Sequence, residues 1–386
     1  MDLTSGPFLG LLVLATLAAA AAVVILWDRL ARPGPVPVLG RVAALVVVNL
    51  FVLATVGAAA NDSFGFFADW TDLAGAFGAA PHASTSTHGG SAGIAAGTAV
   101  AGGGGLPSPP RTLPPLPPGQ RGQREFAYTV TGPLSGLTGQ VFVDLPASYR
   151  DPSARHRRYP VIETFHGYPG VPRQWLDRMG LPQVLDAESA ARHVAPALVV
   201  APQIEIPAGR DTECVDGGPG FPALDTWLTQ DVPNWVVKTF RVRTDRAGWA
   251  AAGLSAGGWC AAMASLLHPA RYGAALVFGG YFGAKFGSAY RPWPPGSPLL
   301  RRYDLIAQVA AAPPPVAMWV ETSHSDRTSF ASTEKFLRVV RPPLAVHLVE
   351  FAHAGHSILL WAGLVPEAVQ WLGAEVPGFR AVPAEG

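Results

Sequence analysis

The sequence has little charge and only two cysteines. Charged residues make up 14% of the 386 residues, hydrophobic residues make up 49%, and the formal net charge is +1. A chain with so small a net charge carries no basic field that would hold nucleic acid. Two cysteines cannot form a structural zinc site, although they can form one disulfide in an oxidising compartment.

Two long stretches, residues 8–27 and 42–60, contain no charged residue. Each is about the length that crosses a bilayer as a helix. Buried core helices and a cleaved signal peptide are the alternatives, but a signal peptide carries positive charge before its apolar core. The leader MDLTSGP contains Asp2 and neither Lys nor Arg. We therefore expect a transmembrane hairpin, followed by an interfacial segment, over residues 1–75.

The charges that flank the two apolar stretches predict the orientation of the hairpin. Cytoplasmic loops of membrane proteins carry an excess of Lys and Arg. The loop between the stretches is rich in arginine, so it is expected inside, and everything after Ala60 is expected outside. The residues concerned are Arg29, Arg32 and Arg41 in the loop, and Asp62, Asp69 and Asp72 after the second stretch.

Residues 76–123 consist largely of Gly, Ala, Ser and Thr, and then of Pro. Such a composition buries no core and favours extended conformations, so we interpret the segment as a linker. A G-x-S-x-G pattern, GGSAG at 89–93, falls within it. Because no strand precedes Ser91 and no amphipathic helix follows it, we do not expect Ser91 to be a nucleophile.

From residue 124 to 386 short apolar runs alternate with helical patterns. This alternation predicts an α/β fold with a mostly parallel sheet and helices on both faces. The expected strands are 140–145, 159–165, 197–201, 249–254, 274–278, 316–321 and 345–351. The expected helices are 175–192, 224–240, 257–268, 303–311, 332–340 and 366–372.

The stretch GLSAGGWC at 253–260 is the strongest catalytic signal. Its serine, Ser255, follows the expected strand 249–254 and opens the expected helix 257–268. A strand–turn–helix with small residues at the turn is what a nucleophile elbow requires, and Gly253 and Gly257 supply them. The alternative is a plain glycine-rich turn, which the pattern alone does not exclude.

The other members of a catalytic triad are expected after the last two strands, because the chain order of this arrangement is serine, acid, histidine. His356 follows the last strand, where Gly355 permits a tight turn, and His353 is its competitor. Asp326 lies in the loop after the preceding strand, and Glu321 at the end of that strand is the alternative acid. Either carboxylate would orient the imidazole and stabilise its charged form.

An oxyanion hole is expected from backbone N–H groups. One is the amide of Ala256, directly after the serine. The other is assigned to Tyr168 in HGYPG (166–170), because Pro169 has no N–H group. The three histidines His324, His353 and His356 do not indicate a metal, since neither a helical i,i+4 pair nor a carboxylate partner accompanies them.

Several motifs within residues 124–378 together resemble the esterase family of α/β-hydrolases, which includes the esterase D group, the feruloyl esterases and the antigen 85 mycolyltransferases. The motifs are VTGPLSGLTGQVFVDLPASY, TFHGYPG, DTECVDG, GLSAGGWCAA and HAGHSILLW. The resemblance implies an α/β-hydrolase fold and acyl transfer through a serine acyl-enzyme, to water or to a sugar hydroxyl. Ser255 and His356 match the family's nucleophile and base, and Asp326 matches less clearly. The antigen 85 proteins have no comparable helical hairpin.

The sequence therefore predicts a membrane-anchored, extracytoplasmic serine esterase that needs no cofactor and acts on an ester or acyl-donor substrate. An acyltransferase acting on an envelope acceptor uses the same residues and remains an alternative. Two further alternatives are a non-catalytic envelope-binding protein and an assembly factor in which Asn49 contacts a partner helix. The connection 281–300 is expected to form part of a substrate cap.

The two cysteines are expected to lie close together. Cys260 falls in the first turns of the helix that follows Ser255, and Cys214 falls in the loop after the expected strand 197–201. Loops that follow parallel strands gather at the same edge of the sheet. We therefore expect a Cys214–Cys260 disulfide that pins the loop 203–222 to the nucleophile helix; two buried free thiols are the alternative.

Overall fold

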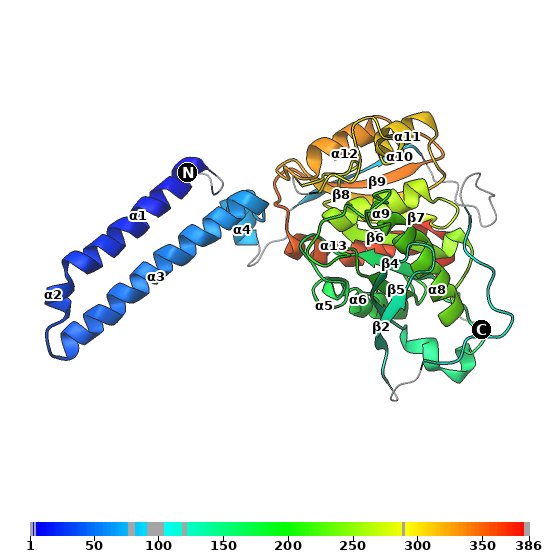
Figure 1. Cartoon of the computed structure of the whole chain (residues 1–386). Helices are drawn as coiled ribbons and strands as arrows, with labels where there is room; N and C mark the ends of the chain where they lie inside the picture. Colours follow the sequence, from blue (N-terminus) through cyan, green and yellow to red (C-terminus); the bar gives the residue numbers. More distant parts are fainter. Residues whose placement is uncertain are drawn as a thin grey trace. The chain divides into compact units, whose positions relative to one another are not determined.

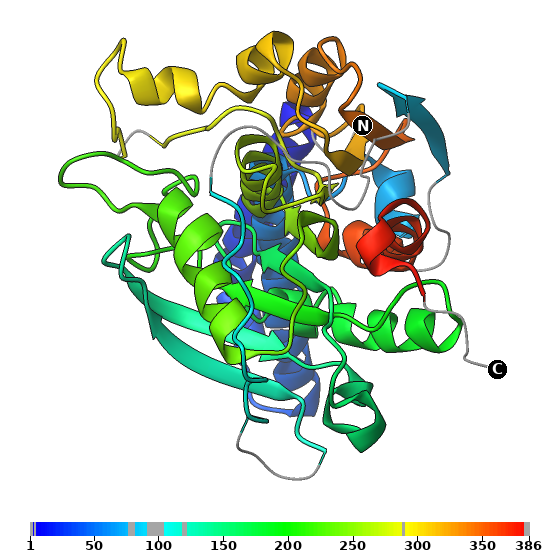
Figure 2. The same ribbon diagram turned by 90° about the vertical axis from the view of Figure 1, so that its right-hand side faces the viewer.

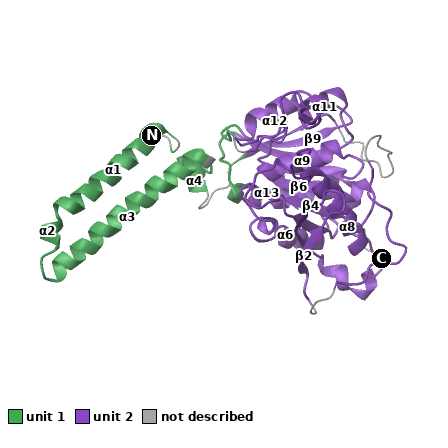
Figure 3. Ribbon diagram, viewed as in Figure 1, with its two compact units in different colours: residues 1–82, 324–327, 352–360 green, residues 83–323, 328–351, 361–386 purple. Residues whose placement is uncertain are grey.

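The computed structural model describes residues 3, 5–75, 82–90, 104–117, 122–287 and 290–381. Ser91 and much of the expected linker lie outside these ranges. The chain forms two compact units (Figure 3). Unit 1 comprises residues 1–82, 324–327 and 352–360, and unit 2 comprises residues 83–323, 328–351 and 361–386.

Unit 1 is built on two long apolar helices (Figure 1), α1 (Gly6–Ile25) and α3 (Pro35–Phe64). Both are long and apolar enough to cross a membrane, and almost none of their surface is buried within the molecule, unlike that of a core helix. Thr16 Oγ1 and Thr55 Oγ1 lie 2.9 Å apart and join them by a hydrogen bond. The short helices α2 (Trp27–Leu30) and α4 (Trp70–Gly75) complete the helices of this unit up to residue 75.

Unit 2 contains a nine-stranded sheet (Figure 2) with the order β1-β9-β8-β7-β6-β4-β5-β3-β2. The pairs from β9 through β8, β7, β6 and β4 to β5 are parallel, whereas β1, β3 and β2 pair antiparallel at the two edges. The strands are β1 (Ala83–His88), β2 (Glu125–Thr131), β3 (Thr138–Asp144), β4 (Val161–Phe165), β5 (Leu198–Pro202), β6 (Trp249–Leu254), β7 (Ala274–Phe278), β8 (Ala317–Ser323) and β9 (Ala345–Phe351).

Helices cover both faces of the sheet, as a buried parallel sheet requires. The helices are α5 (Gln174–Asp177), α6 (Leu181–Ala190), α7 (Leu224–Thr226), η3 (Trp227–Asp231), α8 (Val232–Thr239), α9 (Ala256–Leu267), α10 (Pro298–Arg302), α11 (Leu305–Ala311), α12 (Phe330–Leu337) and α13 (Ile358–Glu375), with short turns at η1 (Ala147–Arg150), η2 (Pro152–Ala154), η4 (Arg246–Gly248) and η5 (Pro377–Phe379).

Successive side chains of a strand point to opposite faces of the sheet, and their contacts show on which face several of these helices lie. On one face Trp249 and Ala251 of β6 join a core cluster that includes residues of α8, α9, α11 and α12. On the other face Phe278 of β7 packs against Trp175 of α5, with ring centroids 5.7 Å apart. Gly279, directly after β7, lies against Trp361 of α13.

The mostly parallel sheet confirms the expected fold class, and all seven expected strands are present within a few residues. The expected strands do not include β1 or β2. β1 lies inside the stretch 76–123 that was expected to be a linker throughout, and this part of the expectation is wrong. Five of its six residues are exposed, so it carries no apolar pattern; backbone pairing with β9 holds it in the sheet.

Candidate active site

Ser255 sits in the tight turn between β6 and α9, with φ 56° and ψ −121°. A non-glycine residue rarely adopts such angles, and backbone strain of this kind clusters at functional sites. Its neighbours have no room for a side chain. A Cβ on Gly253 would lie 1.8 Å from the carbonyl oxygen of Gly257, and a Cβ on Gly257 would lie 2.1 Å from that of Phe165. The glycine spacing is therefore a steric requirement of this turn.

The nucleophile candidate also lies at the N-terminus of α9, a helix of 12 residues. The first amides of a helix have no intrahelical acceptor, and they carry partial positive charge. Ala256 is the first residue of α9, so its N–H group is one of these amides. Ser255 itself is fixed by its own backbone, because its N–H group donates to the carbonyl of Phe278 over 2.8 Å.

The segment HGYPG lies beside this turn. A Cβ on Gly167 would lie 3.5 Å from the Cβ of Ser255, so the backbone of the loop approaches the serine closely. The N–H group of Gly167 donates to Gln174 Oε1 and that of Gly170 to Glu205 Oε1, over 3.2 and 3.0 Å. In the described part of the chain the N–H group of Tyr168 has no such acceptor, which leaves it available to a ligand.

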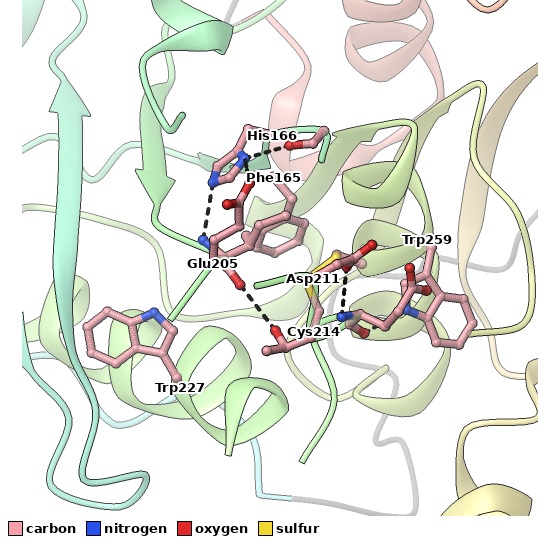
Figure 4. Close-up of a disulfide and its surroundings, with 12 residues drawn as sticks. Phe165, His166, Glu205, Asp211, Cys214, Trp227 and Trp259 are labelled. Atoms are coloured by element: carbon pink, nitrogen blue, oxygen red, sulfur yellow. Dashed lines mark hydrogen bonds and ion pairs between the residues drawn. A yellow bond between two sulfur atoms is a disulfide. The ribbon is translucent and has the colours of Figure 1, made fainter. Parts of the chain in front are cut away.

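His166 holds this loop to its neighbour rather than acting as a base (Figure 4). Its Nδ1–H donates to the carbonyl of Gly167 over 2.8 Å, and its Nε2 accepts the N–H of Ile204 over 3.3 Å. Burial lowers the pKa of His166 to about 4. The imidazole is therefore neutral at physiological pH, with one donor and one acceptor nitrogen, as these two hydrogen bonds require.

Asp326 and His356 come together within unit 1. His356 Nδ1 lies 2.8 Å from Asp326 Oδ2, and the side chains are 12% and 4% exposed. A buried carboxylate on Nδ1 fixes the imidazole tautomer in which Nδ1 carries the proton and Nε2 is the basic nitrogen. His353, the competing base, is exposed. Ser255 belongs to unit 2, so its pairing with His356 stays a prediction.

Glu321, the alternative acid, is engaged elsewhere. Its Oε2 accepts the N–H of Gly279 over 2.8 Å and the Nε1–H of Trp361 over 2.9 Å. Both donors belong to unit 2, and the side chain is 2% exposed. These contacts favour a role for Glu321 in joining β7, β8 and α13.

Glycine is required at position 355 for a different reason from the one expected. It is not among the residues with positive φ, so its conformational freedom does not explain why glycine stands here. Instead, a Cβ on Gly355 would lie 2.2 Å from the carbonyl oxygen of Phe66. Glycine is needed here because another part of the backbone approaches closely.

The structure contains a disulfide between Cys214 and Cys260, with the two Cα atoms 5.7 Å apart (Figure 4). It joins the loop after β5 to the first turns of α9. Trp259 strengthens the same connection, because its Nε1–H donates to the carbonyl of Glu213 over 2.7 Å. Glu213 and Cys214 both have positive φ, so the loop is held in a conformation that these residues rarely adopt alone.

Glu213 is a buried acid that was not among the expected site residues, although the motif DTECVDG contains it. Its side chain accepts the hydroxyl of Tyr281 over 2.6 Å and the N–H of Lys285 over 2.9 Å. Burial, followed by the nearby Asp211 carboxylate, raises the pKa of Glu213 to about 8. The group is therefore protonated at neutral pH, and no local sequence pattern signals such a contact.

Glu213→Gln should make stability less dependent on pH. An acid with a raised folded-state pKa contributes stability that is present below its unfolded pKa, about 4.3, and is lost as pH rises through its folded pKa. The melting temperature of the wild-type protein should therefore fall more between pH 5 and pH 9 than that of Glu213→Gln, by about 5 °C. Thermal unfolding at several pH values measures this difference, and parallel curves would contradict it. Glu163, whose pKa burial also raises to about 8, is present in both proteins and cancels.

Solved structures share the fold of unit 2. A ferulic acid esterase superposes with a TM-score of 0.55 at 18% identity, covering 66% of this chain and 98% of its own. An S-formylglutathione hydrolase from Agrobacterium tumefaciens gives a TM-score of 0.55 at 14% identity, covering 65% and 95%. The fluorophosphonate-binding serine hydrolase F of Staphylococcus aureus gives 0.52 at 14%, covering 64% and 97%.

Sequence comparison agrees with this fold. An uncharacterized protein of Corynebacterium glutamicum is 30% identical over 167 residues, which is 41% of this chain and 38% of that relative. The chain thus matches well under half the length of this relative. The family model described as "Putative esterase" matches residues 137–347, more than half of the chain. The chain belongs to this esterase family.

Proposed function

We propose that the chain is a membrane-anchored serine esterase whose hydrolase domain lies outside the cytoplasm. The observation that carries the proposal is the buried Asp326–His356 pair, 2.8 Å apart. Asp326 follows β8 and His356 follows β9, both later in the chain than the nucleophile turn. Ser255 is the nucleophile, His356 the base, and Asp326 the acid. The N–H groups of Ala256 and Tyr168 form the oxyanion hole.

In the first step Ser255 Oγ attacks the ester carbonyl carbon while His356 Nε2 takes the hydroxyl proton. The carbonyl π electrons move to oxygen, and the two N–H groups stabilise that charge because they are fixed before the reaction begins. Collapse of the tetrahedral intermediate breaks the bond to the alcohol, which leaves with the proton from His356. Water, activated by the same imidazole, then releases the acid and regenerates Ser255.

Transfer to an alcohol differs only in the second step. If a sugar or another envelope hydroxyl replaces water, the acyl group passes to that hydroxyl and the enzyme is an acyltransferase. The same residues serve both reactions, so product analysis with and without a hydroxyl acceptor separates them. The connection 281–300, which lies beyond β7, remains the candidate substrate cap.

Two observations support the proposed location. α1 and α3 are long enough and apolar enough to span a membrane, and they are almost unburied within the chain. The Cys214–Cys260 disulfide suits an oxidising compartment. With Arg29, Arg32 and Arg41 facing the cytoplasm, the positive-inside rule places the hydrolase domain on the opposite side.

Ser255→Ala should abolish ester hydrolysis and labelling by a fluorophosphonate probe. The loss in turnover should be about 10³-fold or more, because the members of a triad act as a unit. Hydrolysis of a series of p-nitrophenyl esters measures the first effect, and in-gel fluorescence the second. Ser91→Ala, which alters the other G-x-S-x-G serine, is the matched control and should keep both activities. Persistent labelling of Ser255→Ala would overturn the assignment.

Asp326→Asn should lower kcat far more than Glu321→Gln. The amide keeps the size of Asp326 but no longer stabilises the imidazolium that forms during catalysis, and it favours the wrong tautomer. Glu321→Gln alters hydrogen bonds to Gly279 and Trp361, so its main effect should be on melting temperature. Steady-state kinetics and thermal unfolding of both variants test this. The reverse ranking in kcat would transfer the role of acid to Glu321.

Cysteine labelling of intact cells tests the orientation, since both native cysteines are in the disulfide. A membrane-impermeant maleimide should label Ser108→Cys, an exposed position of unit 2. It should label Arg32→Cys, an exposed position between α1 and α3, only after the cells are broken. The opposite pattern would show that the hydrolase domain faces the cytoplasm.

A further inference from the structure

The segment from Asn61 to Asp72, at the end of α3, has a well-defined fold of its own. Gly65 ends the helix in the left-handed conformation, and its N–H donates to the carbonyl of Asn61 over 2.7 Å. The Asn61 side chain makes two hydrogen bonds to the backbone of Phe67, of 2.8 and 3.0 Å. Asp69 Oδ1 then accepts the N–H of Asp72 over 2.8 Å, which caps α4.

This segment is also tied to the hairpin. The rings of Phe8 in α1 and Trp70 in α4 meet edge to face, with centroids 5.3 Å apart. Such a contact adds to the burial of both rings. The position of α4 therefore depends on α1 as well as on α3.

Two acceptors of the segment hold the loop that carries His356. Asp72 Oδ2 accepts the N–H of Gly355 over 2.7 Å and the N–H of Ala68 over 2.8 Å. The carbonyl of Gly65 accepts the N–H of His356 over 2.7 Å. Both groups lie in unit 1 with the loop 352–360. Two consecutive amides of the loop are thus fixed by the end of α3.

A steric contact at Gly355 adds to the two hydrogen bonds that hold this loop. A Cβ on Gly355 would lie 2.2 Å from the carbonyl oxygen of Phe66 and 2.7 Å from the Cα of Phe67. The loop backbone therefore lies directly on the backbone of the segment. Asp326 sets the orientation of the imidazole ring, whereas these contacts set the position of the residue that bears it.

We infer that residues 65–72 are a positioning element for the catalytic base, and that Asp72 is its principal positioning residue. The inference rests on the proposed role of His356. A displacement of about 1 Å in a reacting group can cost on the order of 10²-fold in rate. The activity of the hydrolase domain thus depends on the folded end of the membrane anchor, which acts as more than a tether.

The test uses the full-length protein in detergent and compares Asp72→Ala, Asp72→Asn and the control Asp62→Ala, an exposed position in the last turn of α3. Asp72→Ala should lower kcat about 10-fold or more, with KM changed by less than about 2-fold. Asp72→Asn keeps one acceptor oxygen and should recover part of this loss. Asp62→Ala should behave as the wild type. The rate of fluorophosphonate labelling should follow kcat in all variants.

Gly355→Ala provides a second approach to the same contact, because its methyl group would push the loop off Phe66. Combined with Asp72→Ala it should lower kcat hardly more than either change alone, since both release the same constraint. Full additivity would overturn the inference. An unchanged kcat in Asp72→Ala would also overturn it. So would an equal loss of kcat in Asp72→Ala and Asp72→Asn that is fully explained by a smaller amount of folded protein in both variants.

The proposed mechanism and the positioning role of Asp72 can be overturned separately. If Ser255→Ala and His356→Ala are inactive but Asp72→Ala is fully active, the positioning role is wrong and the proposed esterase mechanism survives. If His356→Ala keeps its activity, the mechanism is wrong and the positioning inference falls with it.

Discussion

The close approach between the turn at Ser255 and the end of β4 is the constraint on which the rest of the site depends. A Cβ at Gly257 would overlap the carbonyl oxygens of Phe165 and His166, so the two backbones touch directly. This contact brings the loop after β4 beside the serine. Trp175 donates to the Phe165 carbonyl over 2.8 Å, which prevents the strand end from moving away. The proposed oxyanion donors are thus held by backbone packing before any substrate binds.

Burial keeps two ionisable groups near this turn uncharged at neutral pH. His166 is neutral because burial lowers its pKa to about 4, and Glu213 is neutral because burial raises its pKa to about 8. A carboxylate at Glu213, whose backbone contacts Trp259 in the first turns of α9, would oppose the negative charge that develops on an oxyanion at that helix end. Protonation of Glu213 leaves the field of the helix amides intact.

Structural features that depend on neighbouring residues, such as buried strands and tight turns, were predictable from the sequence. Contacts between backbone segments far apart in the chain were not. The run WAAAGL and the glycines around Ser255 disclose a buried strand and a tight turn, because burial and steric demand act on neighbouring positions. β1 gave no signal, since its side chains are exposed and only its backbone pairs. Asp72 and Gly355 are 283 positions apart, so no local pattern relates them. Gly355 itself was noticed, but for a reason that its backbone angles do not support.

The missed strand β1 explains how the contact between Asp72 and Gly355 is stable. Closing so long a loop with two hydrogen bonds alone would be unfavourable, because each such bond contributes only about 1–3 kcal/mol. β1 pairs with β9 so that Ala83 lies opposite Phe351, and these residues follow Asp72 and precede Gly355 by short distances in the chain. Once β1 and β9 are paired, the loop that the contact between Asp72 and Gly355 closes is shorter by about four halvings of its length. This lowers the entropic cost of closing it by roughly 2–3 kcal/mol. The pairing of β1, a polar edge strand that has no apolar pattern in its sequence, thus allows the end of α3 to hold the loop that carries the proposed base.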